Sequence, residues 1–252
     1  MSAALASPIV ITIDVDWAPD FMIDHTAGIL ADRGVCATWF ITHASPAIDR
    51  LRGRSDLFEI GVHPNFMRGS THGEEPDDVL RHCLELAPDA VSVRSHSLLQ
   101  STPLLDAIAE TSLEIDCSVY IQRVRNAQIF EHWTPSRTLT RVPFVWEDDL
   151  EARRPDALWD FHEDVRGSGS LVVMNFHPVH VFLNSSRLDE YEQLKRLGAR
   201  IGDLPIEKCR SLVAGGHGAG TALLGAAEQL SAVGGGHTLS EVVERLPPPR
   251  SI

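Results

Sequence analysis

Short runs of β-branched and other apolar residues alternate with segments of helical spacing along the first three quarters of the chain. The apolar runs predict strands at residues 10–14, 37–42, 59–63, 90–96, 114–119, 141–144 and 171–177. Between them, the spacing predicts helices within 20–34, 74–90, 101–112 and 185–200. This alternation implies a parallel sheet, either open or closed into a barrel.

Polar residues gather where the predicted strands end. They are Asp14 and Asp16, His63, Arg94 and His96, Asp116, and His177. Because the carboxyl ends of parallel strands meet on one face of a sheet, we expect these side chains to share one site. Asp14 and Asp16 are two residues apart, so on a strand they would point the same way and repel each other unless a cation or a proton holds them.

The chain changes character after residue 200. Gly-rich joints, in "LVAGGHGAG" and "VGGGHT", surround two short helical patterns. We therefore expect a main domain over 1–200 and a Gly-rich helical extension over 201–252 that packs on it. The stretch "GGHGAG" follows no clear strand and lacks the Lys-Ser/Thr of a P-loop, which argues against a phosphate loop.

Charge and composition narrow the choice of partners. The chain of 252 residues carries 22 basic and 35 acidic residues, a formal net charge of −13, which disfavours nucleic acids and anionic membranes. The start, "MSAALASPIVITIDV", has no basic region typical of a signal peptide, so we expect a cytoplasmic protein. The four cysteines form no CxxC pair, which favours buried thiols over disulfides or a thiolate zinc site.

Two histidines suggest a metal site. In "FEIGVHPNFMRGSTHG", His63 ends a predicted strand and His72 lies in the loop that follows. Two imidazoles and a carboxylate can hold a divalent metal and leave positions open for water and substrate. A single histidine is more often a surface residue, and an aspartate after a strand often caps a helix. The hypothesis therefore depends on these residues meeting at one place.

Four segments, "TIDVDW", "GVHPNF", "VRSHS" and "VMNFHP", resemble the ordered motifs of the polysaccharide deacetylase family, carbohydrate esterase family four, which has a NodB-homology domain. The resemblance covers about residues 9–178. It implies a single α/β domain, a deformed (β/α) barrel of seven strands similar to a TIM barrel. The forms "HPNF…GSTHG" and "NFHP" resemble an atypical subgroup, for which we expect small substrates.

The resemblance also implies roles for individual residues. Asp14 matches the general base, and Arg94 matches the arginine that pairs with that base. Asp16 and His63 match two metal ligands. His177 matches the histidine of the final motif, the general acid.

The chain departs from the family pattern at the second metal histidine. That residue usually follows the first by four positions, where this chain has Met67. We expect His72 to replace it as the third ligand, with His25 as a less favoured alternative. Position 96 is usually proline, so the role of His96 is open, and we expect it to line the pocket.

Further pocket residues are expected near the same strand ends. The substrate-binding candidates are Trp17, His96, Asp116, Trp146 and Asp148. Trp146 would wall the acyl pocket, and Asp148 would either orient His177 or bind substrate. The alternative for "WEDD" is an exposed loop followed by a helix start.

The resemblance implies a metal-dependent N-deacetylase that removes an N-acetyl group from an amino sugar. Zn²⁺ suits one aspartate with two histidines, and Co²⁺, Ni²⁺ or Fe²⁺ suit it too. With two Tyr and five Trp, the chain has little material for stacking along a glycan, which favours a small soluble or nucleotide-linked sugar. Two alternatives stay open: hydrolysis of a non-sugar amide or formamide, and a non-catalytic carbohydrate-binding member. A homo-oligomer is compatible with the sequence.

Overall fold

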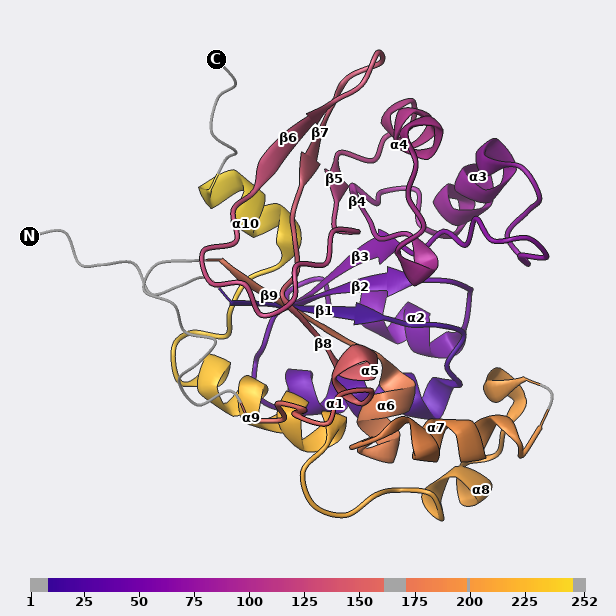
Figure 1. Ribbon diagram of the computed structural model, residues 1–252, viewed down its shortest axis with the longest axis vertical. Helices are drawn as coiled ribbons and strands as arrows, with labels where there is room; N and C mark the ends of the chain where they lie inside the picture. Colours follow the sequence, from indigo (N-terminus) through magenta and orange to yellow (C-terminus); the bar gives the residue numbers. More distant parts are fainter. Residues whose placement is uncertain (1–8, 161–170, 199, 247–252) are drawn as a thin grey trace, which may run out of the picture.

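The computed structural model describes residues 9–160, 171–198 and 200–246, and within them one curved sheet forms the centre of the molecule (Figure 1). Its strands run in the order β6-β7-β5-β4-β3-β2-β1-β9-β8. Neighbouring strands are parallel except for the antiparallel pair β6–β7. The strands are β1 (Ile9–Asp14), β2 (Ala37–Ile41), β3 (Phe58–Val62), β4 (Ser92–Val93), β5 (Ile115–Asp116), β6 (Phe130–Trp133), β7 (Thr138–Arg141), β8 (Trp146–Glu147) and β9 (Val172–Phe176).

The segment from β7 to β8 closes the sheet into a deformed barrel. β7 pairs with β5, and just beyond it Phe144 N–H donates to Val119 O at 2.9 Å. The next residue, Val145, donates to Val173 O at 2.9 Å, and β8 then pairs with β9. One extended segment therefore joins the two ends of the sheet. If the segment from β7 to β8 is counted as one strand and β6 as an added strand, the barrel has seven strands among the described residues. The predicted seven-stranded barrel is therefore confirmed.

Helices surround the barrel, and the last of them along the chain lies at its end (Figure 1). They are α1 (Asp20–Ala31), α2 (Pro46–Arg52), α3 (Pro76–Leu86), α4 (Thr102–Ala109), α5 (Asp148–Glu151), α6 (Pro178–Leu183), α7 (Leu188–Lys195), α8 (Ile206–Arg210), α9 (Ala219–Ser231) and α10 (Leu239–Arg245), with 3₁₀ turns η1 (His96–Leu98) and η2 (Ile201–Asp203). α1, α6 and α9 pack against one another on one side of the sheet (Figure 1). No helix in the described ranges is long and apolar enough to span a membrane.

The predicted elements were found with shifted ends. The predicted strands 90–96 and 114–119 shorten to the two-residue β4 and β5, because the chain turns away at the strand ends that form the site. The helices α1, α3, α4 and α7 lie within the predicted segments. β6, β8 and several short helices lie outside the predicted elements. One of these, α2, carries a clear start signal, Ser45 followed by Pro46, and Ser45 Oγ accepts from Ile48 N–H at 3.4 Å.

Helix α10 covers the end of the barrel at which the strands begin. Leu239 and Val242 of α10 join the interior apolar cluster of the barrel. Leu239 N–H donates to Thr38 Oγ1 at 2.9 Å, and Ser240 N–H donates to Glu59 Oε2 at 3.0 Å. Thr38 and Glu59 lie near the starts of β2 and β3, so α10 covers the amino ends of these strands.

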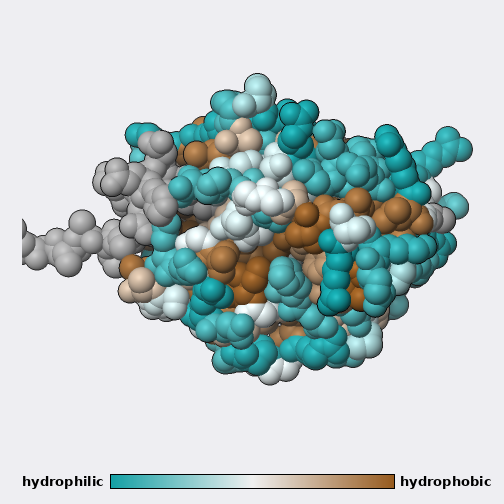
Figure 2. All heavy atoms as spheres, turned by 90° about the horizontal axis from the view of Figure 1, so that it is seen from below, coloured by the Kyte–Doolittle hydropathy of each residue, from teal (hydrophilic) through white to brown (hydrophobic). Residues whose placement is uncertain are grey.

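The face seen from below carries a band of hydrophobic residues (Figure 2). An open groove of about 620 Å³ between α1, α6, α8 and α9 is lined by apolar residues that include Ile29 and Val213. His25 lies in this groove, where its ring contacts Phe182 at a centroid distance of 5.5 Å. The alternative metal ligand His25 is therefore placed on an outer helix face, away from the strand ends.

Candidate active site

The backbone conformation differs between the two aspartates of the first motif. β1 ends at Asp14, whereas Asp16 and Trp17 follow in a turn with positive φ angles of 46° and 54°. Trp17 N–H donates to Thr42 Oγ1 at 3.1 Å and fixes this turn. The idea that strand alternation aligns the two aspartates is wrong in this detail, because a left-handed turn directs the Asp16 carboxylate.

Asp16, His63 and His96 bring three ligand atoms together. His96 Nδ1 lies 3.0 Å from Asp16 Oδ1, and His63 Nε2 lies 3.2 Å from the same oxygen. The two ring nitrogens are 3.2 Å apart. His63 is buried, whereas the side chains of Asp16 and His96 are 26% and 21% exposed. The triangle therefore has one buried corner and two that face outward.

This triangle fits a divalent cation. Ligand bonds of about 2.0–2.1 Å place neighbouring ligand atoms roughly 2.9 Å apart at octahedral angles and roughly 3.4 Å apart at tetrahedral angles. The observed separations of 3.0 to 3.2 Å fall between these values. Two imidazoles and one carboxylate on one face are also a recurrent donor set for catalytic transition metals. The residues present thus suit a metal with open positions toward the pocket.

His72 lies apart from this triangle and has both ring nitrogens engaged. Its Nε2–H donates to Thr42 O at 2.8 Å, and its Nδ1 accepts from Asn65 N–H at 3.2 Å. Burial lowers the pKa of His72 to about 4, so the ring is neutral. Trp17 lies between His72 and His96, with ring centroids 5.3 Å from each. The structure thus brings His96, rather than His72, to Asp16 and His63.

Asp14 sits in a network that holds it ionised. Its Oδ1 accepts from Arg94 Nη1 at 2.9 Å, and its Oδ2 accepts from Asn175 Nδ2 at 2.9 Å. Burial alone would raise the pKa of Asp14, but the charges of Arg94, His63 and His177 hold it below its usual value. The carboxylate is therefore free of a proton and oriented by two donors.

Aromatic rings hold Arg94 in place. Its guanidinium lies 4.6 Å from the Phe40 ring centroid and 4.4 Å from that of Phe144. Gly61 makes room on β3, because a Cβ there would come within 2.8 Å of the Phe40 ring. Arg94 Nε also donates to Cys117 O at 2.8 Å. Two aromatic rings and two hydrogen-bond acceptors, Asp14 Oδ1 and Cys117 O, thus hold the Arg94 guanidinium beside Asp14.

His177 directly follows β9 and is oriented by Asp148. Its Nδ1–H donates to Asp148 Oδ1 at 2.6 Å, and its backbone N–H donates to Asp148 Oδ2 at 2.8 Å. Burial would lower the pKa of His177, but the Asp148 carboxylate raises it well above its usual value. Its Nε2 lies 3.9 Å from both Asp14 Oδ2 and Asp16 Oδ2. A protonated imidazole therefore points at the space next to the triangle.

Three of the expected pocket residues are buried. Asp116 is fully buried and pairs with Arg141. Trp146 is 1% exposed and packs on Phe176 with ring centroids 4.8 Å apart. Asp148 is the first residue of α5 and is also fully buried. The segment "WEDD" therefore contains a helix start, as the alternative interpretation had it, but Asp148 does not lie in an exposed loop.

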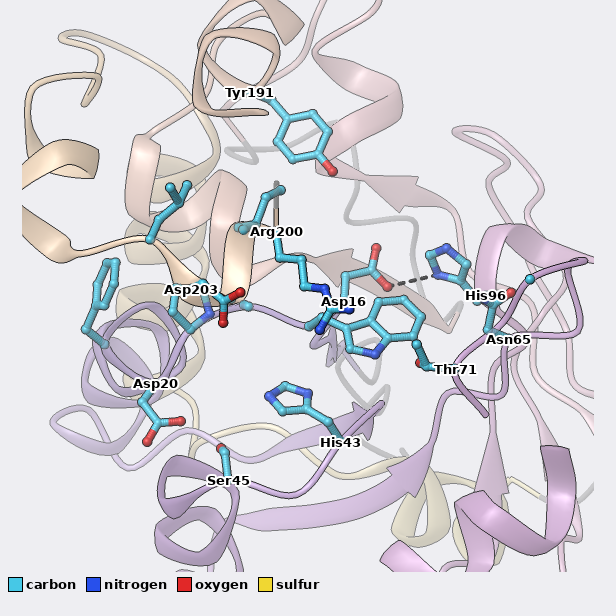
Figure 3. A pocket seen from close by; sticks show the side chains of 18 residues that line it. Asp16, Asp20, His43, Ser45, Asn65, Thr71, His96, Tyr191, Arg200 and Asp203 are labelled. Atoms are coloured by element: carbon cyan, nitrogen blue, oxygen red, sulfur yellow. Dashed lines mark hydrogen bonds and ion pairs between the residues drawn. The ribbon is translucent and has the colours of Figure 1, made fainter. Parts of the chain in front are cut away.

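An open pocket of about 890 Å³ leads to Asp16 and His96 (Figure 3). Trp17 is one of the residues that line it. Tyr191 and Arg200 come from the region of α7 and η2, which no sequence signal connected to the site. The site also includes Asn175, two residues before His177, and Glu147, one residue before Asp148. Neither is among the residues predicted from the sequence.

Comparisons with known proteins agree with this architecture. The structure resembles a "putative polysaccharide deacetylase from Mycobacterium smegmatis", with a TM-score of 0.59, 15% identity, and 100% of this chain and 95% of that chain covered. It also resembles the peptidoglycan deacetylase PdaC from Bacillus subtilis, with a TM-score of 0.50, 11% identity, and coverage of 96% and 92%. These two likenesses show the fold, which is the deformed barrel of the polysaccharide deacetylases.

A nearer relative comes from Bordetella bronchiseptica, a "putative polysaccharide deacetylase involved in o-antigen biosynthesis". It is 36% identical, with a TM-score of 0.77, over 88% of this chain and 90% of that chain. The family model "WbmS-like: Polysaccharide deacetylase" matches residues 11–195. No match was found among curated protein sequences. The chain therefore belongs to the WbmS-like polysaccharide deacetylases.

Proposed function

We propose that this protein is a metal-dependent N-deacetylase that hydrolyses the N-acetyl group of an amino sugar. The observation that carries the proposal is the triangle of Asp16, His63 and His96, with separations of 3.0 to 3.2 Å, beside a base and an acid. His177 Nε2 lies 3.9 Å from Asp16 Oδ2 and from Asp14 Oδ2. Metal ligands, base and acid thus fit around one reacting group.

Asp16, His63 and His96 are the proposed metal ligands, with His96 in the role that the sequence suggested for His72. A divalent cation held there, with Zn²⁺ as our first choice, would lower the pKa of a bound water toward about 7 and polarise the acyl carbonyl. The exposed edges of Asp16 and His96 leave the pocket side open for water and substrate.

Asp14 is the proposed general base. It takes a proton from the attacking water while the oxygen of that water bonds to the acyl carbon. Arg94 and Asn175 each donate to one of its oxygens, which keeps the carboxylate ionised and correctly turned. A positioned base of this kind contributes about 10²–10⁴-fold to the rate.

His177 is the proposed general acid. Its Nε2–H protonates the departing nitrogen as the C–N bond breaks, which releases acetate and the free amine. Asp148 holds the proton on Nδ1 and stabilises the imidazolium. Without this proton an amine is a very poor leaving group.

The pocket supports a small substrate. Its volume of about 890 Å³ lies within the roughly 300–1,000 Å³ of small-molecule sites, and Trp17 and Tyr191 offer aromatic surfaces beside the triangle. We propose that the substrate is a nucleotide-linked or similarly small N-acetylated amino sugar. Because the Bordetella relative is described as involved in O-antigen biosynthesis, a precursor of a surface glycan is our preferred source.

Arg200 is the proposed contact for an acidic part of the substrate. Its side chain extends into the pocket toward Asp16 (Figure 3). Within the part of the chain that the structure describes, its guanidinium has no hydrogen-bond or ion-pair partner. A phosphate of a nucleotide-linked sugar would supply one.

Arg200→Ala should therefore raise KM for a nucleotide-linked N-acetyl sugar about tenfold or more, since a charged hydrogen bond contributes roughly 1.5–3 kcal/mol. The KM for an uncharged N-acetyl monosaccharide should not change, and kcat should stay within about twofold for both. Steady-state acetate release measures these constants. Arg196→Ala, which removes an exposed arginine outside the pocket lining, is the matched control. Equal changes in KM for both sugars would contradict this role of Arg200.

Acetate release from a panel of N-acetyl sugars tests the proposed function itself. The panel pairs nucleotide-linked and free monosaccharides with chitin oligomers, and includes one N-formyl sugar. We expect turnover of a small N-acetyl sugar that stops after chelation and returns when Zn²⁺ or Co²⁺ is added. Turnover that survives complete metal removal would refute metal dependence, and turnover of the oligomers alone would refute the small substrate.

A further inference from the structure

A second carboxyl group, that of Glu147, lies buried beside the proposed base and acid. Glu147 ends β8, and its residue is 6% exposed. Its Oε1 accepts from Asn175 Nδ2 at 3.0 Å. The same amide nitrogen donates to Asp14 Oδ2 at 2.9 Å, so one NH₂ group serves both carboxyl groups. The orientation of this amide is fixed, because its Oδ1 accepts from Thr12 Oγ1 and from Arg94.

Glu147 also faces the acid. Its Oε1 lies 3.9 Å from His177 Nε2, the same distance that separates this nitrogen from Asp14 Oδ2. Asp14 has Arg94 as its own counter-ion, and His177 has Asp148 at its other nitrogen. Among the described residues, no ion pair other than this 3.9 Å contact with His177 is found for Glu147.

The surroundings favour the neutral form of Glu147. The charged and titratable groups that face it are Asp14 from β1, Arg94 after β4, His177 after β9, Asp149 on α5 and Tyr120 after β5. Burial, together with the negative charges of Asp149 and Asp14, raises the pKa of Glu147 to about 8 against the opposing effect of His177 and Arg94. Two carboxylates that share one amide in a low-dielectric site do not readily ionise together.

We propose that Glu147 is a positioning residue that works as a neutral carboxyl group, and that its ionisation sets the alkaline limit of activity. This inference rests on the proposed function. As a neutral group, Glu147 accepts a hydrogen bond from one N–H of the Asn175 amide. The second N–H of this amide then donates to Asp14. Once ionised, it would compete with substrate for the proton on His177 Nε2 and would repel the Asp14 carboxylate through the shared amide. The proton it loses goes to solvent, so no other reactant is needed.

The first test compares the pH dependence of kcat/KM between pH 6 and 10 for the wild type and Glu147→Gln. Glutamine has nearly the same shape and stays neutral at every pH. We expect an alkaline limb near pH 8 in the wild type and a limb at least about one pH unit higher in the variant. Superimposable profiles, or a loss of more than about tenfold at pH 7, would overturn the proposal, because Glu147 would then be inert or needed as a carboxylate.

The second test needs no activity. An unfolded glutamate ionises near pH 4.5, whereas folded Glu147 keeps its proton up to about pH 8. The folded wild type therefore binds more protons between these values and loses stability as the pH rises through them. The Tm of Glu147→Gln minus that of the wild type should thus increase from pH 5 to pH 9. Glu85→Gln, which removes an exposed carboxylate on α3, should show no such trend.

The two tests separate the inference from the function on which it rests. A constant Tm difference from pH 5 to 9 would overturn the neutral Glu147 even in an active deacetylase. If the wild type released no acetate from any sugar, the proposed function and the role in activity would both fail. A rising Tm difference would in that case still establish a buried proton on Glu147.

Discussion

An Asp14→Asn variant is expected to release acetate about 10³-fold more slowly than the wild type while binding metal as before. Asparagine keeps the size of the side chain but cannot accept the proton of the attacking water. Asp14 is not a corner of the triangle of Asp16, His63 and His96, so the loss should appear in kcat without loss of metal. Steady-state kinetics and elemental analysis of the same preparation measure both quantities.

The matched control is Asp32→Asn, which removes an exposed carboxylate at the end of α1 and should leave kcat and metal content unchanged. Turnover of the Asp14 variant within about tenfold of the wild type would show that another group takes the proton. Metal loss in this variant would show that Asp14 belongs to the metal site instead.

The second large effect distinguishes the two histidines that compete for the role of third ligand. His96→Ala should lower the metal content from about one ion per chain to below about 0.1 under limiting metal, and should lower activity more than about 100-fold. The change removes one of the three proposed protein donors, and changes even in residues that support metal ligands cost about 10–100-fold. Elemental analysis after dialysis against a weak chelator measures the binding.

His72→Ala is the matched comparison for His96→Ala. It should retain the metal but unfold at a lower temperature, because Thr42 O and Asn65 N–H lose their buried partner. Metal loss in the His72 variant with full metal in the His96 variant would reverse the assignment. The sequence alone favoured that reversed assignment.

Much of the barrel follows from sequence. Buried strands between helices produce long β-branched runs, so β1, β2, β3 and β9 were found nearly to the residue. β4 and β5 are only two residues long, and their flanks carry the site rather than regular pairing. Hydrophobic periodicity does not detect such short strands. It also does not show that the segment from β7 to β8 pairs first with β5 and the residues after it, and then with β9.

The strand-end rule predicted most of the residues that meet, but Asp116 pairs with Arg141 instead, and the rule did not show which residues contact one another. Asp14, Asp16, His63, Arg94 and His177 do converge. The pairing of Asp16 with His96 depends on a left-handed turn after Val15 and on η1, where Ser97 and Leu98 have positive φ angles. Neither conformation has a sequence signal here, since no glycine marks it.

The sequence contains one signal that favours His96. His96 follows Arg94 by two residues at the end of a predicted strand, the same spacing that links Asp14 to Asp16. His72 was favoured because it lies in the loop after His63, but nearness along the chain does not place a side chain. In the structure the His72 ring instead anchors that loop to Thr42.

The most direct test of the account is an anomalous-scattering map from crystals grown with Zn²⁺. We expect one strong peak within about 2.0–2.2 Å of Asp16 Oδ1, His63 Nε2 and His96 Nδ1. The His72 ring should still contact Thr42 O in the same crystals. A map with no peak among these three atoms, or with a peak bound by His72, would contradict it.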